Sequence, residues 1–180
     1  MDKRVEANRE TKVRITYALV SLLASKKLSD ISVTDIVERA GVARASYYRN
    51  FSSKEDVLAE AGRFIIDDFR RSISHVEGGC RGYEGILFAF RYFASYREPL
   101  LRLHRAGFTG IYEDLFRTYV EDEARDVVRD EFSRYRIAFF SSALFGFYVS
   151  WLENGMQESP EVMAKLFCSM ASGAIDEAQG

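Results

Sequence analysis

The sequence contains few of the residues that interrupt helices. Two of its 180 residues are proline, Pro99 and Pro160. Because proline breaks both helices and central strands, this shortage leaves room for long helices. The alternation of apolar and polar residues that indicates half-buried strands is also hard to find, whereas residues of high helix propensity dominate. We therefore predict an all-α fold of about nine helices.

Cysteine and histidine are scarce too, which argues against several kinds of chemistry. Cys80 and Cys168 lie far apart and match no CxxC or metal-binding spacing, so we expect ordinary thiols, with a redox switch as the alternative. His75 and His104 lack a partner at the spacing of metal ligands. We expect no catalytic, metal or cofactor site, because no Ser/His/Asp or paired-carboxylate pattern is present; a small helical enzyme is the competing class.

Long apolar runs are missing as well. The first residues, MDKRVEANRETKVR, are charged throughout and lack the apolar segment of a signal peptide. The most apolar stretch, IAFFSSALFGFYVSWL at 137–152, is interrupted by serine and glycine and is too short to span a bilayer. These features predict a cytoplasmic protein that does not enter a membrane.

Charge is plentiful but unevenly distributed. The formal net charge is −2, yet residues 1–54 carry 11 Lys+Arg against 6 Asp+Glu. Residues 55–180 carry 14 Lys+Arg against 21 Asp+Glu. Because nucleic-acid phosphates attract basic side chains, a basic head on an acidic body favours a nucleic-acid-binding N-terminal part. Chance segregation of solvated charges is the alternative.

Helical periodicity extends through most of the chain. The first helix is predicted over 7–25, with Val13, Ile15, Ala18, Leu19, Leu22 and Leu23 on its buried face. After the break EGGCRG at 77–82, five further helices are predicted over about 83–96, 97–106, 109–128, 131–155 and 160–176.

Two short helices are predicted between these regions. Thr34 is the expected N-cap of the first, which ends at Gly41, a residue suited to the left-handed conformation. The second is expected over 44–50. Ser53, followed three residues later by Asp56, resembles a capping box at the start of a longer helix.

Two short helices joined by a turn that begins with glycine form the helix-turn-helix pattern, whose second helix can enter the DNA major groove. Arginine can donate two hydrogen bonds to a guanine edge, and alanine can contact a thymine methyl. Hydroxyl and ammonium groups can hold phosphates, as can a helix N-terminus. The predicted DNA-binding residues are Thr34, Arg44, Ala45, Ser46, Tyr48, Arg49, Asn50 and Lys54.

The stretch SVTDIVERAGVARASYYRNFSSKEDVL at 32–58 resembles the DNA-binding signature of the tetracycline-repressor (TetR/AcrR) family of bacterial transcription regulators. Two positions depart from that signature. Lys27-Leu28 stands where the family often has glycine and an aromatic residue, and Tyr47 stands where many members have a smaller or apolar residue. The resemblance is carried by Ile36, Ala40-Gly41-Val42, Tyr48, Phe51, Lys54 and Leu58.

The resemblance implies a division of labour along the chain. Residues 1–54 would form the DNA-binding helix-turn-helix domain and residues 55–180 a helical effector-binding and dimerisation domain, connected by the helix over about 54–76. It further implies that Tyr48 and Lys54 contact phosphates, whereas Arg44, Ala45, Ser46 and Arg49 face the bases. We predict a repressor that binds a pseudo-palindromic operator as a homodimer and is released by a small-molecule signal. A coactivator-type regulator controlled by a protein partner is the alternative.

The C-terminal two-thirds of the chain is rich in aromatic residues at helical spacing. Such a stripe is more often core than a binding pocket, and both interpretations remain open. If a pocket exists, it would receive a small hydrophobic or aromatic effector. Its predicted lining is Phe88, Tyr92, Phe93, Tyr96, Phe108, Tyr112 and Phe116.

The last two predicted helices are apolar or small on nearly every face. A helix that is apolar all round must be buried on all sides, which favours a four-helix contact with a second copy of the chain. The run GFYVSWLENGMQESPEVMAKLF at 146–167 also resembles the C-terminal domain of one subset of the family. The predicted interface consists of Phe140, Leu144, Phe147, Trp151, Leu166 and Met170.

Overall fold

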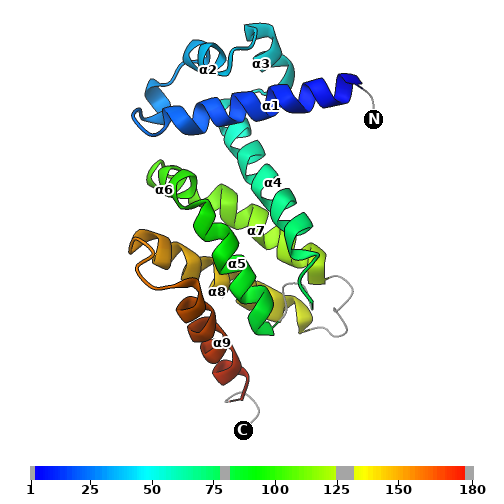
Figure 1. Cartoon of the computed structure of the whole chain (residues 1–180), viewed down its shortest axis with the longest axis vertical. Coiled ribbons are helices and arrows are strands. Elements are labelled where there is room, and N and C mark those ends of the chain that lie inside the picture. The colour runs from blue at the N-terminus through cyan, green and yellow to red at the C-terminus, as the bar shows by residue number, and fades with distance from the viewer. Residues whose placement is uncertain (1–2, 78–81, 125–131, 177–180) are drawn as a thin grey trace. The chain divides into compact units, whose positions relative to one another are not determined.

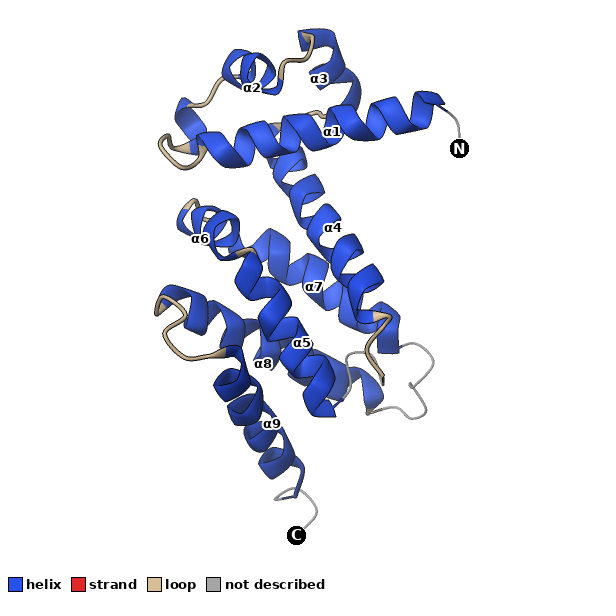
Figure 2. Cartoon of the chain, in the orientation of Figure 1, coloured by secondary structure: helices blue, strands red, loops and turns tan. Residues whose placement is uncertain are grey.

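The computed structural model describes residues 3–77, 82–124 and 132–176, and within these ranges all regular structure is helical (Figure 2). The all-α prediction is therefore confirmed. In chain order the elements are α1 (Lys3–Leu22), the 3-10 helix η1 (Leu28–Asp30), α2 (Val33–Ala40), α3 (Arg44–Asn50), α4 (Lys54–Ile73), α5 (Gly82–Ser95), α6 (Arg97–Arg105), α7 (Thr109–Ala124), α8 (Ser133–Glu153) and α9 (Pro160–Asp176) (Figure 1).

The chain divides into two compact units. The first consists of Met1–Ile65 with Glu98–Tyr112, and the second consists of Ile66–Arg97 with Glu113–Gly180. Most of α6 and the first residues of α7 therefore belong with α1–α3, which a boundary placed after residue 54 does not anticipate. The assignment of DNA binding and effector binding to separate domains stays a prediction.

The start of α2 differs from the prediction, because its N-cap is Ser32 and not Thr34. The Ser32 hydroxyl accepts a hydrogen bond from the Asp35 N–H at 3.1 Å, and the Asp35 carboxylate accepts one from the Ser32 N–H at 2.8 Å. This reciprocal capping box needs a polar residue three positions after the cap. With Thr34 as the cap, that position would be Val37, whose side chain cannot accept a hydrogen bond from the backbone N–H of the cap. The bonds from Ser32, assisted by Lys26, hold the pKa of Asp35 far below its usual value.

The turn after α2 has the predicted geometry. Gly41 is left-handed, with φ of 61°, and its N–H donates to the carbonyls of Val37 and Glu38. Arg14 Nη2 donates to the Gly41 carbonyl at 2.8 Å, and a Cβ at Gly41 would lie 2.7 Å from that nitrogen. Both the positive φ and the close arginine therefore favour glycine at this turn.

Helix α4 begins at the predicted position, whereas α1 is Lys3–Leu22 where 7–25 was predicted. The Ser53 hydroxyl accepts from the Asp56 N–H at 3.1 Å as predicted, but the Asp56 carboxylate accepts from the Ser52 N–H instead of that of Ser53. On α1, Ile15 is buried as expected, whereas Val13 is 44% exposed and does not belong to the buried face. Apolar spacing predicted the helix but not the edge of its buried stripe.

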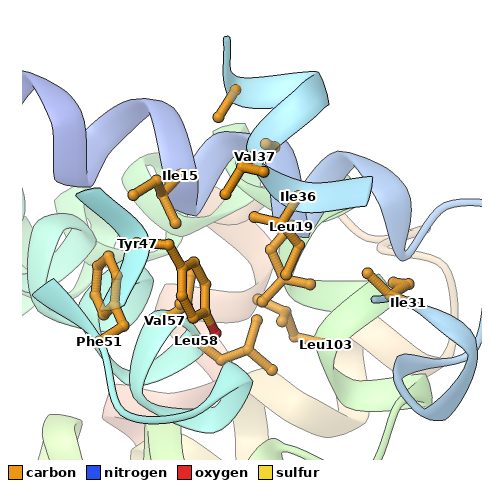
Figure 3. Packing of buried hydrophobic residues seen from close by; sticks show 12 residues of the cluster. Ile15, Leu19, Ile31, Ile36, Val37, Tyr47, Phe51, Val57, Leu58 and Leu103 are labelled. Atoms are coloured by element: carbon orange, nitrogen blue, oxygen red, sulfur yellow. The ribbon is translucent and has the colours of Figure 1, made fainter. Parts of the chain in front are cut away.

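The core of the first unit joins four α-helices of the N-terminal region to one from the middle of the chain. In Figure 3 the side chains from α1, α2, α3 and α4 point toward a common interior, and Leu103 of α6 lies among them. Tyr47, the residue that departs from the family signature, is 1% exposed and packs its ring against that of Phe51 at a centroid distance of 6.0 Å. The buried members include Ile15, Ala18, Leu19, Ile31, Ile36, Val37, Ala40, Tyr47, Phe51, Val57, Leu58 and Leu103.

The Tyr47 hydroxyl is buried without a hydrogen-bond partner among the described residues, and burial raises the pKa of Tyr47. Because a buried hydroxyl that makes no bond only costs desolvation, Tyr47→Phe is expected to raise the free energy of unfolding by about 1 kcal/mol. Thermal denaturation measures this change. Tyr48→Phe, at an exposed position of the same helix, is the control and should leave stability unchanged. A loss of stability in Tyr47→Phe would contradict the expectation.

The core of the second unit is built mainly on α5, α8 and α9. Phe90 of α5 packs edge-on against Trp151 of α8 at 5.5 Å, and Phe167 of α9 closes the same cluster. At the surface, Arg91 donates to Glu161 at 2.6 Å, and this bond lowers the pKa of Glu161 to about 2. No helix within the described ranges combines the length and apolar character needed to cross a membrane.

Candidate nucleic-acid interface

Helix α3 has one face buried and one face exposed. Tyr47 fixes the buried face in the core of the first unit, and Val42 packs against the same core from the preceding turn. Residues three or four positions apart on a helix share a face. Because the Tyr47 side chain points into the core, the side chains on the opposite face of the helix point outward. The exposed side chains on this helix are Arg44, Ala45, Tyr48 and Arg49. The structure thus brings four of the predicted residues together on one surface.

Two arginines of this face are paired with neighbours on the same helix. Arg44 Nη2 donates to the Tyr48 hydroxyl at 3.2 Å, and its guanidinium carbon lies 5.6 Å from the centre of the Tyr48 ring. Arg49 Nη2 donates to the Ser46 hydroxyl at 3.1 Å. These are i,i+4 and i,i+3 contacts, the spacings at which helical side chains meet.

Three other predicted residues have different surroundings. Asn50 is half-buried and donates from Nδ2 to the Ser46 carbonyl at 2.8 Å, so its amide completes the helix backbone. Ser46 is half-buried as well. Thr34 is exposed in the first turn of α2, where its hydroxyl lies near the positive end of a helix.

Lys54 has a structural function that the sequence did not indicate. Its ammonium donates to the carbonyl of Leu28 at 2.5 Å and to that of Ile31 at 2.8 Å. It therefore ties the ends of the η1 segment to the start of α4. A lysine has three N–H donors, so one remains for another acceptor. A phosphate contact by Lys54 stays a prediction.

Two basic side chains near the turn were not predicted. Arg14 of α1 bonds to the Gly41 carbonyl, and Arg39 of α2 donates from Nε to the Ser21 hydroxyl at 2.8 Å. Both residues are exposed. Arginines on the polar face of an amphipathic helix next to a helix-turn-helix are the signal that would have identified them.

The predicted pocket residues fall into separate clusters. Phe88, Tyr92 and Phe93 surround Phe69 in the second unit, with ring centroids 5.0–6.1 Å apart, and the Tyr92 hydroxyl donates to Asp68 at 2.8 Å. Desolvation, with bonds to Tyr96 and Asp68, raises the pKa of Tyr92. Phe116 packs in the core that contains Phe90 and Trp151.

The remaining two predicted pocket residues belong to the first unit. Phe108 and Tyr112 pack against its core, and the Tyr112 hydroxyl donates to the Leu58 carbonyl at 3.0 Å. Burial raises the pKa of the Tyr112 hydroxyl well above its usual value. Within their own units these residues belong to different core clusters, and the pocket stays a prediction.

The predicted dimer interface is also divided. Leu144 and Trp151 are buried in the core of their own unit, and their place in an interface stays a prediction. Phe140 and Phe147 are half-buried against Phe167. Leu166 and Met170 are exposed, as are three apolar residues that sequence reasoning did not name: Tyr135, Phe139 and Val162.

Comparison with known families covers both units. The family model described as bacterial regulatory proteins, tetR family, matches residues 15–61. A second model, described as a transcriptional regulator C-terminal region, matches residues 83–173. No curated protein matches the sequence.

Several solved structures share the fold. A TetR transcriptional regulator from Streptococcus agalactiae 2603V has a TM-score of 0.63 and 21% identity, over 93% of this chain and 97% of that one. The dihydroxyacetone kinase operon activator DhaS has a TM-score of 0.64 and 16% identity, over 92% and 96%. NalD, the secondary repressor of the MexAB-OprM multidrug efflux pump in Pseudomonas aeruginosa, has a TM-score of 0.57 and 18% identity, over 91% and 96%.

Proposed function

The chain belongs to the tetR family of bacterial regulatory proteins, and from this premise we propose that it is a repressor that binds a pseudo-palindromic operator as a homodimer and leaves it when a small molecule binds. The observation that carries the proposal is the exposed face of α3, where Arg44, Ala45, Tyr48 and Arg49 project from a helix fixed by Tyr47. A regulator that binds operator DNA acts where that DNA is, so we propose that the protein works in the cytoplasm.

Exposed apolar side chains on α8 and α9 support the dimer. Large apolar side chains that are exposed on a protein surface mark an interaction site where they form a patch. A second copy would cover it symmetrically and would present two recognition helices to the two half-sites of a palindrome. The exposed residues are Tyr135, Phe139, Val162, Leu166 and Met170.

Two signals could release the operator. The aromatic cluster around Phe69 supports a small hydrophobic or aromatic effector, and NalD, a repressor by its name, has the same fold. DhaS, which is named an operon activator, also has this fold and supports instead a coactivator controlled by a protein partner. Calorimetric titration with candidate aromatic compounds, beside affinity capture with the purified protein, distinguishes these alternatives.

Replacing Arg44 tests the DNA-binding proposal. Footprinting on the DNA that flanks the gene locates the operator, and gel shifts with single-base variants of it then measure affinity and base preference. Because a good arginine–base pair discriminates by about 1–3 kcal/mol, Arg44→Ala should weaken operator binding roughly 5- to 150-fold and relax the preference at one position of each half-site. Unchanged affinity and unchanged base preference would contradict the role of Arg44.

Arg117→Ala is the matched control. Arg117 is an exposed arginine of the second unit that pairs with Asp114 at 2.6 Å, so its removal changes the net charge equally. We expect operator binding by this variant to equal that of the wild type.

A further inference from the structure

We propose that Tyr48 positions Arg44 for base recognition, in addition to any phosphate contact of its own. This inference rests on the proposed function, because it concerns how the same helix reads its operator. Its observation is the double contact between the two side chains, a hydrogen bond of 3.2 Å and a guanidinium placed 5.6 Å from the ring centre.

Donor and acceptor chemistry fixes the direction of that hydrogen bond. A guanidinium has only donors, so the Tyr48 oxygen must accept from Arg44. The single hydroxyl hydrogen of Tyr48 then remains free to donate. Phosphate oxygens only accept, so Tyr48 can bind a phosphate without releasing Arg44. Arg44 keeps four further N–H donors, and a guanine edge requires two.

The Tyr48 ring is itself restrained by the core. Tyr47, which is 1% exposed, contacts the Tyr48 ring edge-on, with centroids 5.4 Å apart and an interplanar angle of 86°. A buried ring thus supports an exposed ring, and the exposed ring supports the arginine. A long side chain that is already restrained loses less conformational entropy when it binds, so binding is more favourable.

Arg49 provides the internal comparison. It is exposed on the same helix and donates to the Ser46 hydroxyl at 3.1 Å, and within the described residues no aromatic ring lies against its guanidinium. Arg44 therefore has two kinds of restraint where Arg49 has one. Because each arginine donates to its own hydroxyl, removal of the Tyr48 hydroxyl should affect Arg44 and not Arg49.

The test measures base preference, which a purely structural or phosphate-binding residue would not change. In Tyr48→Phe the ring remains and the hydroxyl is lost; in Ser46→Ala the acceptor of Arg49 is lost. Gel shifts with operators mutated at each position should show discrimination at the Arg44 position reduced roughly 2- to 10-fold in Tyr48→Phe. In Ser46→Ala, any loss of discrimination should fall at the base position that Arg49 contacts and not at the Arg44 position. In an Arg44→Ala background, Tyr48→Phe should no longer change base preference.

Two results would decide against the proposal or its premise. If Tyr48→Phe weakens all sequences equally and discrimination is preserved, Tyr48 only contacts phosphate and the inference is wrong. If the wild-type protein shows no sequence-specific binding, the proposed function fails. A measurement without DNA separates the two cases: NMR relaxation of the Arg44 side-chain N–H should show greater mobility in Tyr48→Phe than in the wild type, and equal mobility would reject the pairing.

Discussion

Leu166→Arg is expected to separate the proposed homodimer into monomers and to weaken operator binding by about a hundredfold. Leu166 lies on α9 and is 48% exposed, with the exposed Val162 and Met170 one turn away on either side. An arginine in the centre of an apolar interface would lose its hydration without gaining a partner. Since the two recognition helices would bind DNA as a linked pair, separating the subunits would remove the effective concentration that linkage provides.

Analytical ultracentrifugation measures the subunit state, and gel shifts on the footprinted operator measure affinity. Thr118→Arg, which places the same side chain at an exposed position of α7, is the matched control and should remain a dimer. Because Leu166 is half exposed, the variant should keep its melting temperature apart from the contribution of dimerisation. A Leu166→Arg protein that stays dimeric and binds with unchanged affinity would overturn the proposed interface.

Local sequence patterns predicted the bounds of α3 correctly. Glycine at position 41 indicated a left-handed turn, and the helix-turn-helix pattern placed α3 at 44–50, as observed. These features depend on residues within one or two helical turns. The N-cap of α2 was misplaced because two hydroxyl residues, Ser32 and Thr34, compete there, and only the position of Asp35 distinguishes them.

Contacts between distant parts of the chain could not be predicted in this way. Lys54 bonds to carbonyls more than twenty residues earlier, and main-chain carbonyls leave no trace in a sequence. On α8, apolar residues occupy nearly every face, so periodicity could not show that Leu144 and Trp151 face inward while Phe139 faces outward. The exposed apolar residues that a partner would contact can therefore be identified only from the three-dimensional packing of the unit.

Leu103 shows the largest consequence of such a distant contact. It comes from α6, is 1% exposed, and lies in the core formed by Leu19, Ile36 and Leu58 (Figure 3). Leu103→Ala would leave a cavity there, so we expect the free energy of unfolding of the first unit to fall by about 2–5 kcal/mol. Hydrogen exchange should then show faster exchange of the backbone amides of α1–α3, even though the substitution is more than fifty residues away in the sequence.

The single tryptophan makes the effect assignable to one unit. Trp151 lies in the core of the second unit, so its fluorescence reports that unit, whereas circular dichroism reports all helices. In Leu103→Ala, part of the helical signal should be lost at a temperature below the fluorescence transition, and operator binding should disappear over the same range. Val13→Ala, at an exposed position of α1, should change stability by less than about 0.5 kcal/mol. If amide exchange in α1–α3 is unchanged in Leu103→Ala, then α6 does not stabilise these helices, which include α3 with its exposed face.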